Sequence, residues 1–538
     1  MLRRLTSLLL HKAFPGMPPA THRYEVRRNI EVPMSDGTLL LGDLYLPFLT
    51  NTQKAPTVLI RSPYGRAGIG APICRLLAEQ GFPVFSQSCR GTAGSGGVFT
   101  PQLNEQSDGI DTHEWVRAQP WFTGRLVTTG MSYLGYTQWA VAGKTQPDAM
   151  CLQVTMPDFG AVTWDNGAFS LRNALGWSAM MARRDRFAAP LRQVLPDRRL
   201  AAAFDHLPLA EGDRVSTGAT IDWYQDWVNR ADLGDDYWTA QSHTAAVPEV
   251  TAPVSMIAGW YDIFLPWQLR TYRQLVEAGN PPELTVGPWG HASPPLLRDT
   301  PAAVHNFLTR RLMGGPATRP DPVRVYVTGA EEWRGYAEWP PPGVRTSWLL
   351  HPEGGLGLGP APVCAPSRYV YDPADPTPAL GGPALDPKSG PVDNTEHERR
   401  ADVLTFTSVA LTEAVEVLGE PVATIALRSD RANTDLFVRI CDVHPDGKSW
   451  TVCDGIRRVD ADAEEGEVTV PLWPTAHRFR AGHRIRIQIS SGAHPRYARN
   501  TGGDEPPGTA RILHRAHQEI RHDPSHRSRV DLPTRPAV

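Results

Sequence analysis

The first part of the chain alternates short apolar runs with longer segments of helical periodicity. Residues 24–46 contain two strand-like runs on either side of Ser35-Asp36-Gly37, which predicts a β-hairpin. Further short apolar runs follow with helical segments between them, and this rhythm predicts βαβ units and a mostly parallel sheet. The predicted strands lie just after Gly81 and at residues 57–60, 126–129, 152–156, 254–258 and 284–286.

A long insertion separates the strands predicted at 152–156 and 254–258. It contains "WDNGAFSLRNALGWSAMMARRDRF" and "IDWYQDWVNRADL", which are rich in helix formers and aromatic residues. Both stretches are typical of helices. The insertion therefore predicts a helical cap.

The character of the chain changes after about residue 315. Short alternating runs such as "VRVYVTG", "VATIALRS", "TDLFVRICDV" and "HRIRIQISSG" are separated by Gly, Pro and Asp. This spacing is typical of an antiparallel β-sandwich such as a jelly roll. We therefore predict an α/β core in two halves (22–158 and 248–315), a cap insertion (159–247) and a jelly-roll domain (316–538).

Composition fits this division and excludes some classes of partner. The 538 residues exceed what one hydrophobic core usually serves. The 41% hydrophobic and 21% charged residues are ordinary for a globular protein, and the net charge is −3. We therefore expect neither a nucleic acid nor a membrane as partner.

The cysteines show no C-x-x-C pair, which argues against a zinc ribbon or a thioredoxin-like site. We expect buried free thiols. Cys441 and Cys453 flank a predicted turn at Asp446-Gly447, and whether they pair stays open. The cysteines are Cys74, Cys89, Cys151, Cys364, Cys441 and Cys453.

The N-terminal stretch "MLRRLTSLLLHKAFPG" has a short apolar core that Thr6 and Ser7 interrupt and His11-Lys12 end. A secretory signal needs about 7–15 apolar residues and a small-residue cleavage site. No window approaches the roughly 18 apolar residues of a membrane span. We expect a cytoplasmic protein.

The stretch "GRLVTTGMSYLGYTQWAVAG" places Ser132 between a predicted strand and a predicted helix. A catalytic serine of α/β enzymes stands on such a turn in a G-x-S-x-G pattern. Here Leu134 occupies the place of the second glycine, and Gly135 follows one residue later. The motif alone is weak, and an ordinary serine in a tight turn stays an alternative.

A serine nucleophile needs a base, and the base needs an acid to orient it. In the expected chain order, "GWYDIF" places Asp262 after the strand at 254–258, and "GPWGH" places His291 after the strand at 284–286. Asp262 could instead cap the following helix, and His291 could be an ordinary loop histidine. The combination of order, spacing and strand context favours a triad of Ser132, Asp262 and His291.

An acyl-transfer site also needs donors for the developing oxyanion. The backbone N–H of Tyr133, directly after the serine, is one candidate. The loop "RSPYG" offers the hydroxyl of Tyr64 as the second. The Tyr64 ring could also pack under the site, which is compatible with donating.

These motifs resemble those of the cocaine-esterase-like hydrolases, relatives of the X-Pro dipeptidyl peptidases and α-amino-acid ester hydrolases. The matching segments include "RSPYGR", "CRGTAGSGGVF", "GMSYLG", "GWYDIF", "GPWGH" and, in the β-rich region, "HPRYARN". The resemblance implies an α/β-hydrolase core with an inserted helical cap and a C-terminal jelly roll. It also implies that Phe264 and Trp164 bind substrate, and it gives Ser132, Asp262, His291, Tyr64 and Tyr133 the roles above.

The expected activity is cleavage of a small-molecule ester or amide through an acyl-enzyme, with no metal and no organic cofactor. An acyltransferase with the same triad stays open, as do X-Pro dipeptidyl-peptidase and α-amino-acid ester hydrolase activities and, more remotely, a non-catalytic binding protein. The sequence lacks the long N-terminal extension typical of the X-Pro dipeptidyl peptidases that it resembles, which disfavours dipeptide release from proline-containing N-termini. A homodimer stays open. The amino-acid ester hydrolases hold the ammonium group of their substrate with a cluster of carboxylates. The carboxylates in comparable places here are Asp158, Asp165, Glu331 and Glu332, and we expect them to be solvated at the surface instead.

Overall fold

The structure is a computed structural model that describes residues 2–48, 55–67, 70–183, 197–315, 319–385, 389–459 and 465–536. It divides into two compact units. The first comprises Met1–Phe159, Asp236–Gly259 and Phe264–Arg324. The second comprises Gly160–Asp235, Trp260–Ile263 and Val325–Val538.

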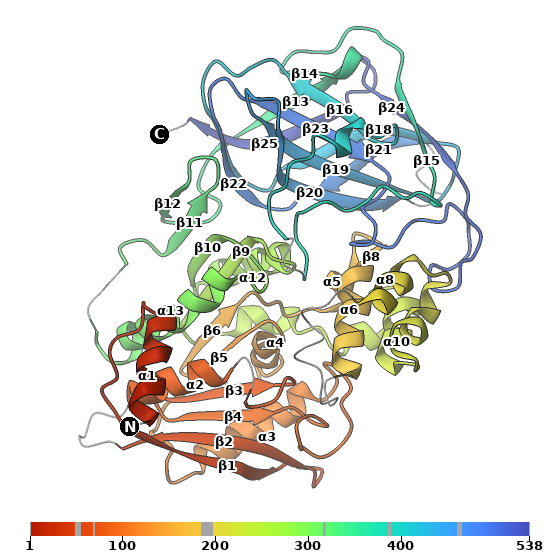
Figure 1. Cartoon of the computed structure of the whole chain (residues 1–538). Coiled ribbons are helices and arrows are strands. Elements are labelled where there is room, and N and C mark those ends of the chain that lie inside the picture. The colour runs from red at the N-terminus through yellow and green to blue at the C-terminus, as the bar shows by residue number, and fades with distance from the viewer. Residues whose placement is uncertain are drawn as a thin grey trace. The chain divides into compact units, whose positions relative to one another are not determined.

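The first unit is built on a mixed sheet with the strand order β1-β2-β4-β3-β5-β6-β9-β10 (Figure 1). The pairs β1–β2 and β2–β4 are antiparallel, whereas β3–β4, β3–β5, β5–β6 and β6–β9 are parallel. The strands are β1 (Tyr24–Pro33), β2 (Leu39–Pro47), β3 (Thr57–Ser62), β4 (Val84–Ser88), β5 (Leu126–Met131), β6 (Ala149–Gln153), β9 (Val254–Tyr261) and β10 (Glu283–Gly290). The helices of this unit are α1 (Leu2–Ala13), α2 (Ala71–Glu79), α3 (Glu105–Arg117), α4 (Tyr133–Trp139), α11 (Asp236–Thr239), α12 (Leu265–Glu277) and α13 (Pro294–Leu312), with a 3₁₀ turn at Thr244–Glu249.

Helices cover both faces of this sheet. Val58 and Ile60 of β3 pack in one apolar cluster with Phe307 of α13, while Leu59 packs in another cluster with Val116 of α3. Successive strand residues point to opposite faces, so both faces of β3 are buried. Continuous apolar strands between helical layers are typical of parallel α/β sheets.

Strands β6 and β10 differ from their predicted bounds in ways that affect the loops beside them. The run 152–156 predicts a strand, but β6 is Ala149–Gln153, because Val154 adopts a φ of 41° and leaves the sheet. The strand predicted at 284–286 extends to Gly290 as β10. Residues 287–290 are therefore strand and not loop.

In the helical part of the second unit, a hairpin follows the first short helix, in a stretch that the sequence pattern predicts to be helical. Strands β7 (Trp164–Asp165) and β8 (Ala168–Phe169) pair antiparallel around Asn166-Gly167. Both turn residues have positive φ, 48° and 85°, as a type I′ turn requires. The helices of this part are α5 (Gly160–Thr163), α6 (Leu171–Ala182), α8 (Arg198–Asp205), α9 (Gly212–Thr217) and α10 (Asp222–Asn229), with a 3₁₀ turn at Leu209–Glu211. Residues 184–187, also expected to be helical, lie outside the described residues.

The rest of the second unit is a β-rich domain whose strands pair almost entirely antiparallel. Alternate residues of its strands, such as Leu436, Val438 and Ile440, enter one apolar core. The strands of its sheet are β13 (Val344–His351), β14 (Gly355–Gly357), β15 (Ser367–Tyr371), β16 (Leu404–Ser408), β17 (Val415–Gly419), β18 (Val422–Ser429), β19 (Thr434–Val443), β20 (Ser449–Val459), β21 (Glu465–Pro471), β22 (Thr475–Phe479), β23 (Arg484–Ser490), β24 (Ala516–Arg521) and β25 (Arg529–Pro536). Strands β11 (Val323–Val327) and β12 (Glu332–Tyr336) instead follow β10 in the strand order of the first sheet. Short 3₁₀ turns lie at Pro352–Gly354 and His397–Arg399.

Cys441 and Cys453 lie on neighbouring strands of this domain but are free thiols. In the β19–β20 register Cys441 is opposite Thr451, and Cys453 is opposite Ile440. The four other cysteines are free as well.

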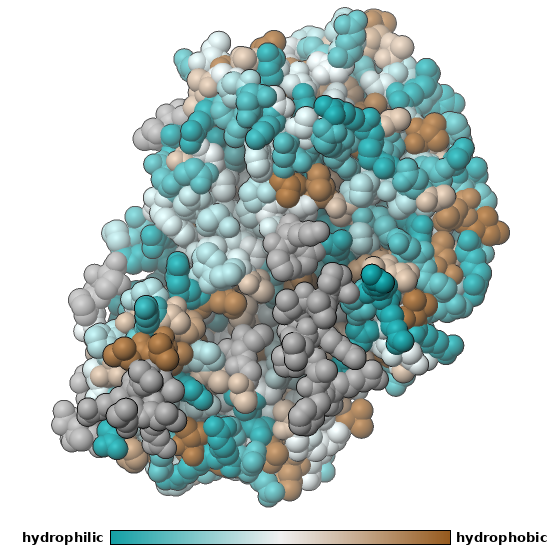
Figure 2. All heavy atoms as spheres, in the orientation of Figure 1, coloured by the Kyte–Doolittle hydropathy of each residue, from teal (hydrophilic) through white to brown (hydrophobic). Residues whose placement is uncertain are grey.

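Polar residues dominate the face of the molecule shown in Figure 2, with apolar residues scattered among them. Among the described helices, none is both long and apolar enough to cross a membrane.

A charged network is buried in the β-rich domain. Asp454, 1% exposed, accepts hydrogen bonds from Arg439 Nη2 at 2.9 Å and Arg496 Nη1 at 2.6 Å. Burial alone would raise the pKa of Asp454, but the Arg496 and Arg439 guanidinium groups hold it below its usual value. The carboxylate therefore stabilises the fold at neutral pH, and this contribution is lost as the pH falls through the lowered pKa.

Asp454→Asn should lower the free energy of unfolding of this domain by about 3–5 kcal/mol, because it leaves two buried guanidinium groups without their counter-charge. Chemical denaturation of the full chain, followed through the transition of this domain, measures the change. The matched control is Glu396→Gln, which breaks an exposed pair with Arg399 and should cause no measurable change. Equal effects of the two variants would contradict the prediction.

Candidate active site

Ser132 occupies a sharp turn between β5 and α4. Its backbone has φ 58° and ψ −127°, a conformation that non-glycine residues rarely adopt. The turn is tied to the end of β6: Ser132 N–H donates to the Gln153 carbonyl at 2.9 Å, and Thr155 Oγ1 donates to the Ser132 carbonyl at 2.7 Å. The strain is held by contacts on both sides, as in a nucleophile elbow.

Two glycines explain why Leu134 is tolerated in this turn. A Cβ on Gly130 would lie 2.4 Å from Leu134 Cβ, so only one of these two positions can carry a side chain. A Cβ on Gly135 would lie 2.5 Å from the side chain of Thr155, which approaches the helix closely. Gly135, one residue later than in the usual motif, therefore allows α4 to pack against the loop after β6.

His291 directly follows β10 and brings its imidazole to the serine. His291 Nε2 lies 2.9 Å from Ser132 Oγ, within reach for proton transfer. The ring of Phe264 packs edge-on against His291, with centroids 5.2 Å apart at 83°. The imidazole is therefore held between the serine hydroxyl and an aromatic wall.

Asp262 directly follows β9 and is fully buried. Helix α12 begins at Leu265 with Phe264 as its N-cap, so Asp262 does not cap this helix. The alternative that Asp262 is a helix cap is therefore wrong.

The other predicted site residues lie in different surroundings. Tyr64 packs against the apolar cluster that contains Leu134, and Tyr133 is the first residue of α4. Trp164 is 2% exposed inside the second unit, where its indole N–H donates to the Trp227 carbonyl at 2.9 Å. Its role in substrate binding stays a prediction.

Among the four carboxylates expected to be solvated, Asp165 is buried. It accepts a hydrogen bond from Tyr497 Oη at 2.5 Å. Burial raises the pKa of Asp165, although the Tyr497 hydrogen bond opposes the shift. The expectation of a solvated Asp165 is wrong, because a sequence pattern does not show which tyrosine will cover a carboxylate.

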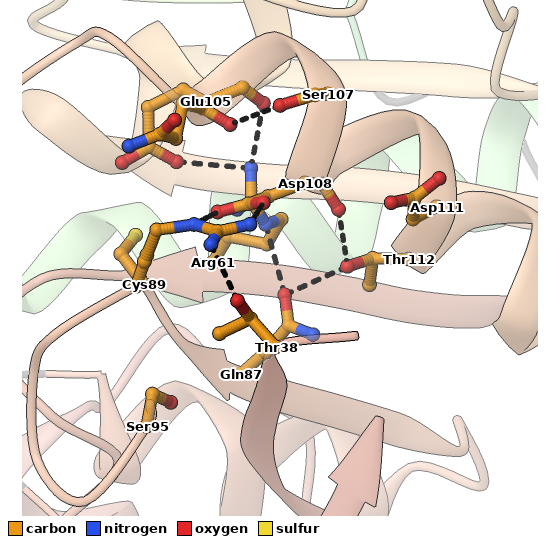
Figure 3. Close-up of polar contacts among 12 residues, drawn as sticks. Thr38, Arg61, Gln87, Cys89, Ser95, Glu105, Ser107, Asp108, Asp111 and Thr112 are labelled. Atoms are coloured by element: carbon orange, nitrogen blue, oxygen red, sulfur yellow. Dashed lines mark hydrogen bonds and ion pairs between the residues drawn. The ribbon is translucent and has the colours of Figure 1, made fainter. Parts of the chain in front are cut away.

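A buried polar network supports the start of α4 and was missed by the sequence analysis. Tyr133 Oη donates to Glu105 Oε1 at 2.9 Å and accepts from the Gln102 N–H at 2.8 Å. Glu105 Oε2 pairs with Arg61 Nη1 at 3.0 Å, and Arg61 Nε donates to Gln87 at 2.9 Å. Figure 3 shows Arg61 with Glu105, Gln87 and the neighbouring Asp108.

The charges of this network are mutually compensated. Burial alone would lower the pKa of Arg61, but Glu105 raises it, so the guanidinium stays charged. Burial, and then Glu105, raises the pKa of Tyr133 well above its usual value, so its hydroxyl stays a donor. The sequence signal was an arginine inside an otherwise apolar strand, "TVLIRS", which needs a buried acidic partner.

A serine on a strained strand-to-helix turn, with an imidazole on its hydroxyl at the carboxyl ends of the strands of a largely parallel sheet, defines a serine hydrolase of the α/β-hydrolase class. Family comparison agrees: residues 36–293 match the X-Pro dipeptidyl-peptidase (S15 family), and residues 316–531 match the X-Pro dipeptidyl-peptidase C-terminal non-catalytic domain. The chain belongs to this family. The predicted family and a serine hydrolase of the esterase or peptidase type are therefore confirmed.

Individual relatives cover the chain almost completely. It is 32% identical to the cocaine esterase of Rhodococcus sp. (strain MB1 Bresler), over 95% of this chain and 98% of that protein. Among solved structures, an aminopeptidase from a marine sediment Thaumarchaeota archaeon has a TM-score of 0.82 at 22% identity, covering 95% and 96% of the two chains. An α-amino acid ester hydrolase has a TM-score of 0.81 at 21% identity, covering 95% and 97%. The predicted fold, an α/β-hydrolase with a C-terminal β-sandwich, is confirmed.

Tyr133→Phe should lower kcat about tenfold and change KM less than twofold, because a small displacement of a catalytic turn costs rate more than binding. The variant removes the hydroxyl that Glu105 and the Gln102 N–H share. Steady-state kinetics on a chromogenic ester measures both constants. Tyr224→Phe, which loses a buried hydroxyl bonded to the Leu209 carbonyl, is the matched control and should keep kcat. An unchanged kcat in Tyr133→Phe would show that the network does not position the turn.

Proposed function

We propose that the chain cleaves carboxylic esters of small molecules through an acyl-enzyme formed on Ser132. The observation that carries the proposal is the 2.9 Å approach of His291 Nε2 to Ser132 Oγ on a strained turn. A serine hydroxyl at its ordinary pKa is a weak nucleophile, and an imidazole at this distance can take its proton as it attacks. Asp262, buried after β9, is proposed to orient His291.

The reaction then runs in two halves. Ser132 Oγ bonds to the substrate carbonyl carbon while its proton passes to His291 Nε2. The oxyanion accepts hydrogen bonds from the Tyr133 N–H and, we propose, from the Tyr64 hydroxyl. The C–O bond to the leaving group breaks, and His291 donates its proton to that oxygen. Water attacks the acyl-enzyme through the same steps and releases the acid.

The similarity to the cocaine esterase supports ester cleavage over peptide cleavage. At 32% identity over nearly the whole length, that relative is named for an ester substrate. The aminopeptidase and the amino acid ester hydrolase are below 25% identity and support the fold alone. Phe264 against His291 supports an apolar or aromatic acyl group in the substrate.

X-Pro dipeptidyl-peptidase activity is the second candidate, because the matching family model carries that description. An acyltransferase would use the same acyl-enzyme and pass the acyl group to an alcohol or amine instead of water. The acceptor of the acyl group separates an acyltransferase from a hydrolase, and the bond that is cleaved separates a dipeptidyl peptidase from an esterase.

A fluorophosphonate should label the wild-type chain at Ser132 with a stoichiometry near one. Ser132→Ala should lose the label and at least about 10³-fold of the esterase activity, because the nucleophile is gone. Mass spectrometry of the labelled peptide identifies the site. Ser62→Ala, a serine at the end of β3, is the control and should still be labelled. Labelling that persists in Ser132→Ala would overturn the proposal.

Substrate preference is tested with p-nitrophenyl esters of acetate, butyrate and benzoate beside Gly-Pro and aminoacyl p-nitroanilides. We expect kcat/KM for the best ester to exceed that for every anilide by at least about 100-fold. Product analysis with and without added alcohols measures acyl transfer. Faster cleavage of the Gly-Pro anilide would identify a dipeptidyl peptidase, and acyl transfer faster than hydrolysis would identify an acyltransferase.

A further inference from the structure

Three histidines surround one buried carboxylate in the β-rich domain. Asp442, 2% exposed, lies near the end of β19. His444 follows it in the turn after β19, His483 precedes β23, and His477 belongs to β22. None of these residues takes part in the proposed catalytic reaction.

The register of the sheet explains why two of the histidines meet Asp442. In the antiparallel β19–β23 pair, Asp442 is opposite Ile485 and Val443 is opposite Arg484. Continued by one residue, this register places His444 opposite His483. Since residues two apart on a strand share a face, Asp442, His444 and His483 project from the same side.

The polar atoms of these three side chains converge. His483 Nδ1 is 2.9 Å from Asp442 Oδ1, and His444 Nε2 is 3.6 Å from Asp442 Oδ2. The two imidazole rings are 4.5 Å apart at their centroids. One ligand atom from each of the three residues lies within 4.8 Å of the others.

These separations are close to those that a small cation needs. Ligand atoms about 2.0–2.1 Å from a tetrahedral zinc ion lie about 3.3 Å from one another. Small rotations of the two imidazoles would bring the three donor atoms to that spacing. Two imidazoles and a carboxylate are ligands that zinc and other divalent transition metals accept.

Backbone hydrogen bonds fix the chain at the two histidines, and a third histidine contacts the carboxylate. The backbone N–H of His444 donates to the Lys448 carbonyl at 2.9 Å, and the backbone N–H of His483 donates to the Arg480 carbonyl at 3.1 Å. His477 Nε2 lies 3.2 Å from Asp442 Oδ2, and its Nδ1 lies 2.9 Å from the Thr328 hydroxyl. His477 therefore orients the carboxylate, as outer partners of metal ligands do.

We propose that Asp442, His444 and His483 bind a divalent transition-metal ion, with zinc the best match, and that water completes the coordination. The side chain of His444 is 38% exposed, so the remaining position can face solvent. The ion would join the end of β19 to the start of β23 and stabilise the domain. Its binding does not depend on the proposed esterase reaction.

The test titrates the full chain, stripped of metal with a chelator, with Zn²⁺ by calorimetry and with Co²⁺ by visible absorption. We expect one site per chain with micromolar or tighter affinity for Zn²⁺. His444→Gln, on a partly exposed turn, should fold normally and weaken binding at least about tenfold, and His483→Gln should do the same. Circular dichroism of the metal-free variants checks their folding.

Two control variants separate this site from others in the chain. His526→Gln alters an Asp–His pair in the same domain, where His526 Nδ1 is 3.0 Å from Asp523 Oδ2. Cys364→Ser removes a thiol 3.3 Å from His522 Nδ1, and this variant tests that pair as an alternative place for the ion. Both controls should bind Zn²⁺ as the wild type does. Absence of saturable binding, or loss of binding in Cys364→Ser with full binding in His444→Gln, would overturn the proposal.

Discussion

The strained backbone of Ser132 is the constraint on which the first unit depends. A residue with φ 58° and ψ −127° costs free energy and persists only where its surroundings leave no alternative. Here the surroundings are the end of β6, which accepts the Ser132 N–H, and Thr155, which donates to its carbonyl. Gly130 and Gly135 leave the space that lets these contacts form. The position of the Ser132 hydroxyl is thus a product of the packing beneath the turn.

Charged side chains are buried both under this turn and in the β-rich domain, and in both places oppositely charged partners surround them. Arg61 lies among Glu105, Gln87 and Asp108, and Asp454 lies between two arginines. Replacing such a network with apolar residues is often neutral or stabilising, so its presence is weak evidence for stability alone. A hydrogen-bonded network fixes the orientation of its side chains. Here Glu105 accepts a hydrogen bond from the Tyr133 hydroxyl and thereby fixes the first residue of α4.

Family membership and site geometry constrain different parts of the function. The match to the S15 family and to its C-terminal domain establishes the kind of enzyme. The position of His291 on Ser132, with Phe264 against the imidazole, supports the proposed chemistry and an apolar acyl group. Fold similarity extends to an aminopeptidase and an ester hydrolase alike, so the scaffold by itself does not select the leaving group.

The sequence by itself determined the α/β and β-rich halves and the turn that carries Ser132, because apolar periodicity and chain order are local signals. It also placed His291 directly after a strand, and the hydrogen bond to Ser132 agrees with that position. The hairpin at Asn166-Gly167 is also a local signal, which the helical interpretation of its surroundings overlooked. Only the tertiary structure decided which distant groups meet. Arg61 of β3 pairs with Glu105 of α3. Asp442 is surrounded by His477 of β22, His444 of the turn after β19 and His483 before β23. Long-range pairing of this kind depends on sheet register, which local pattern alone does not specify.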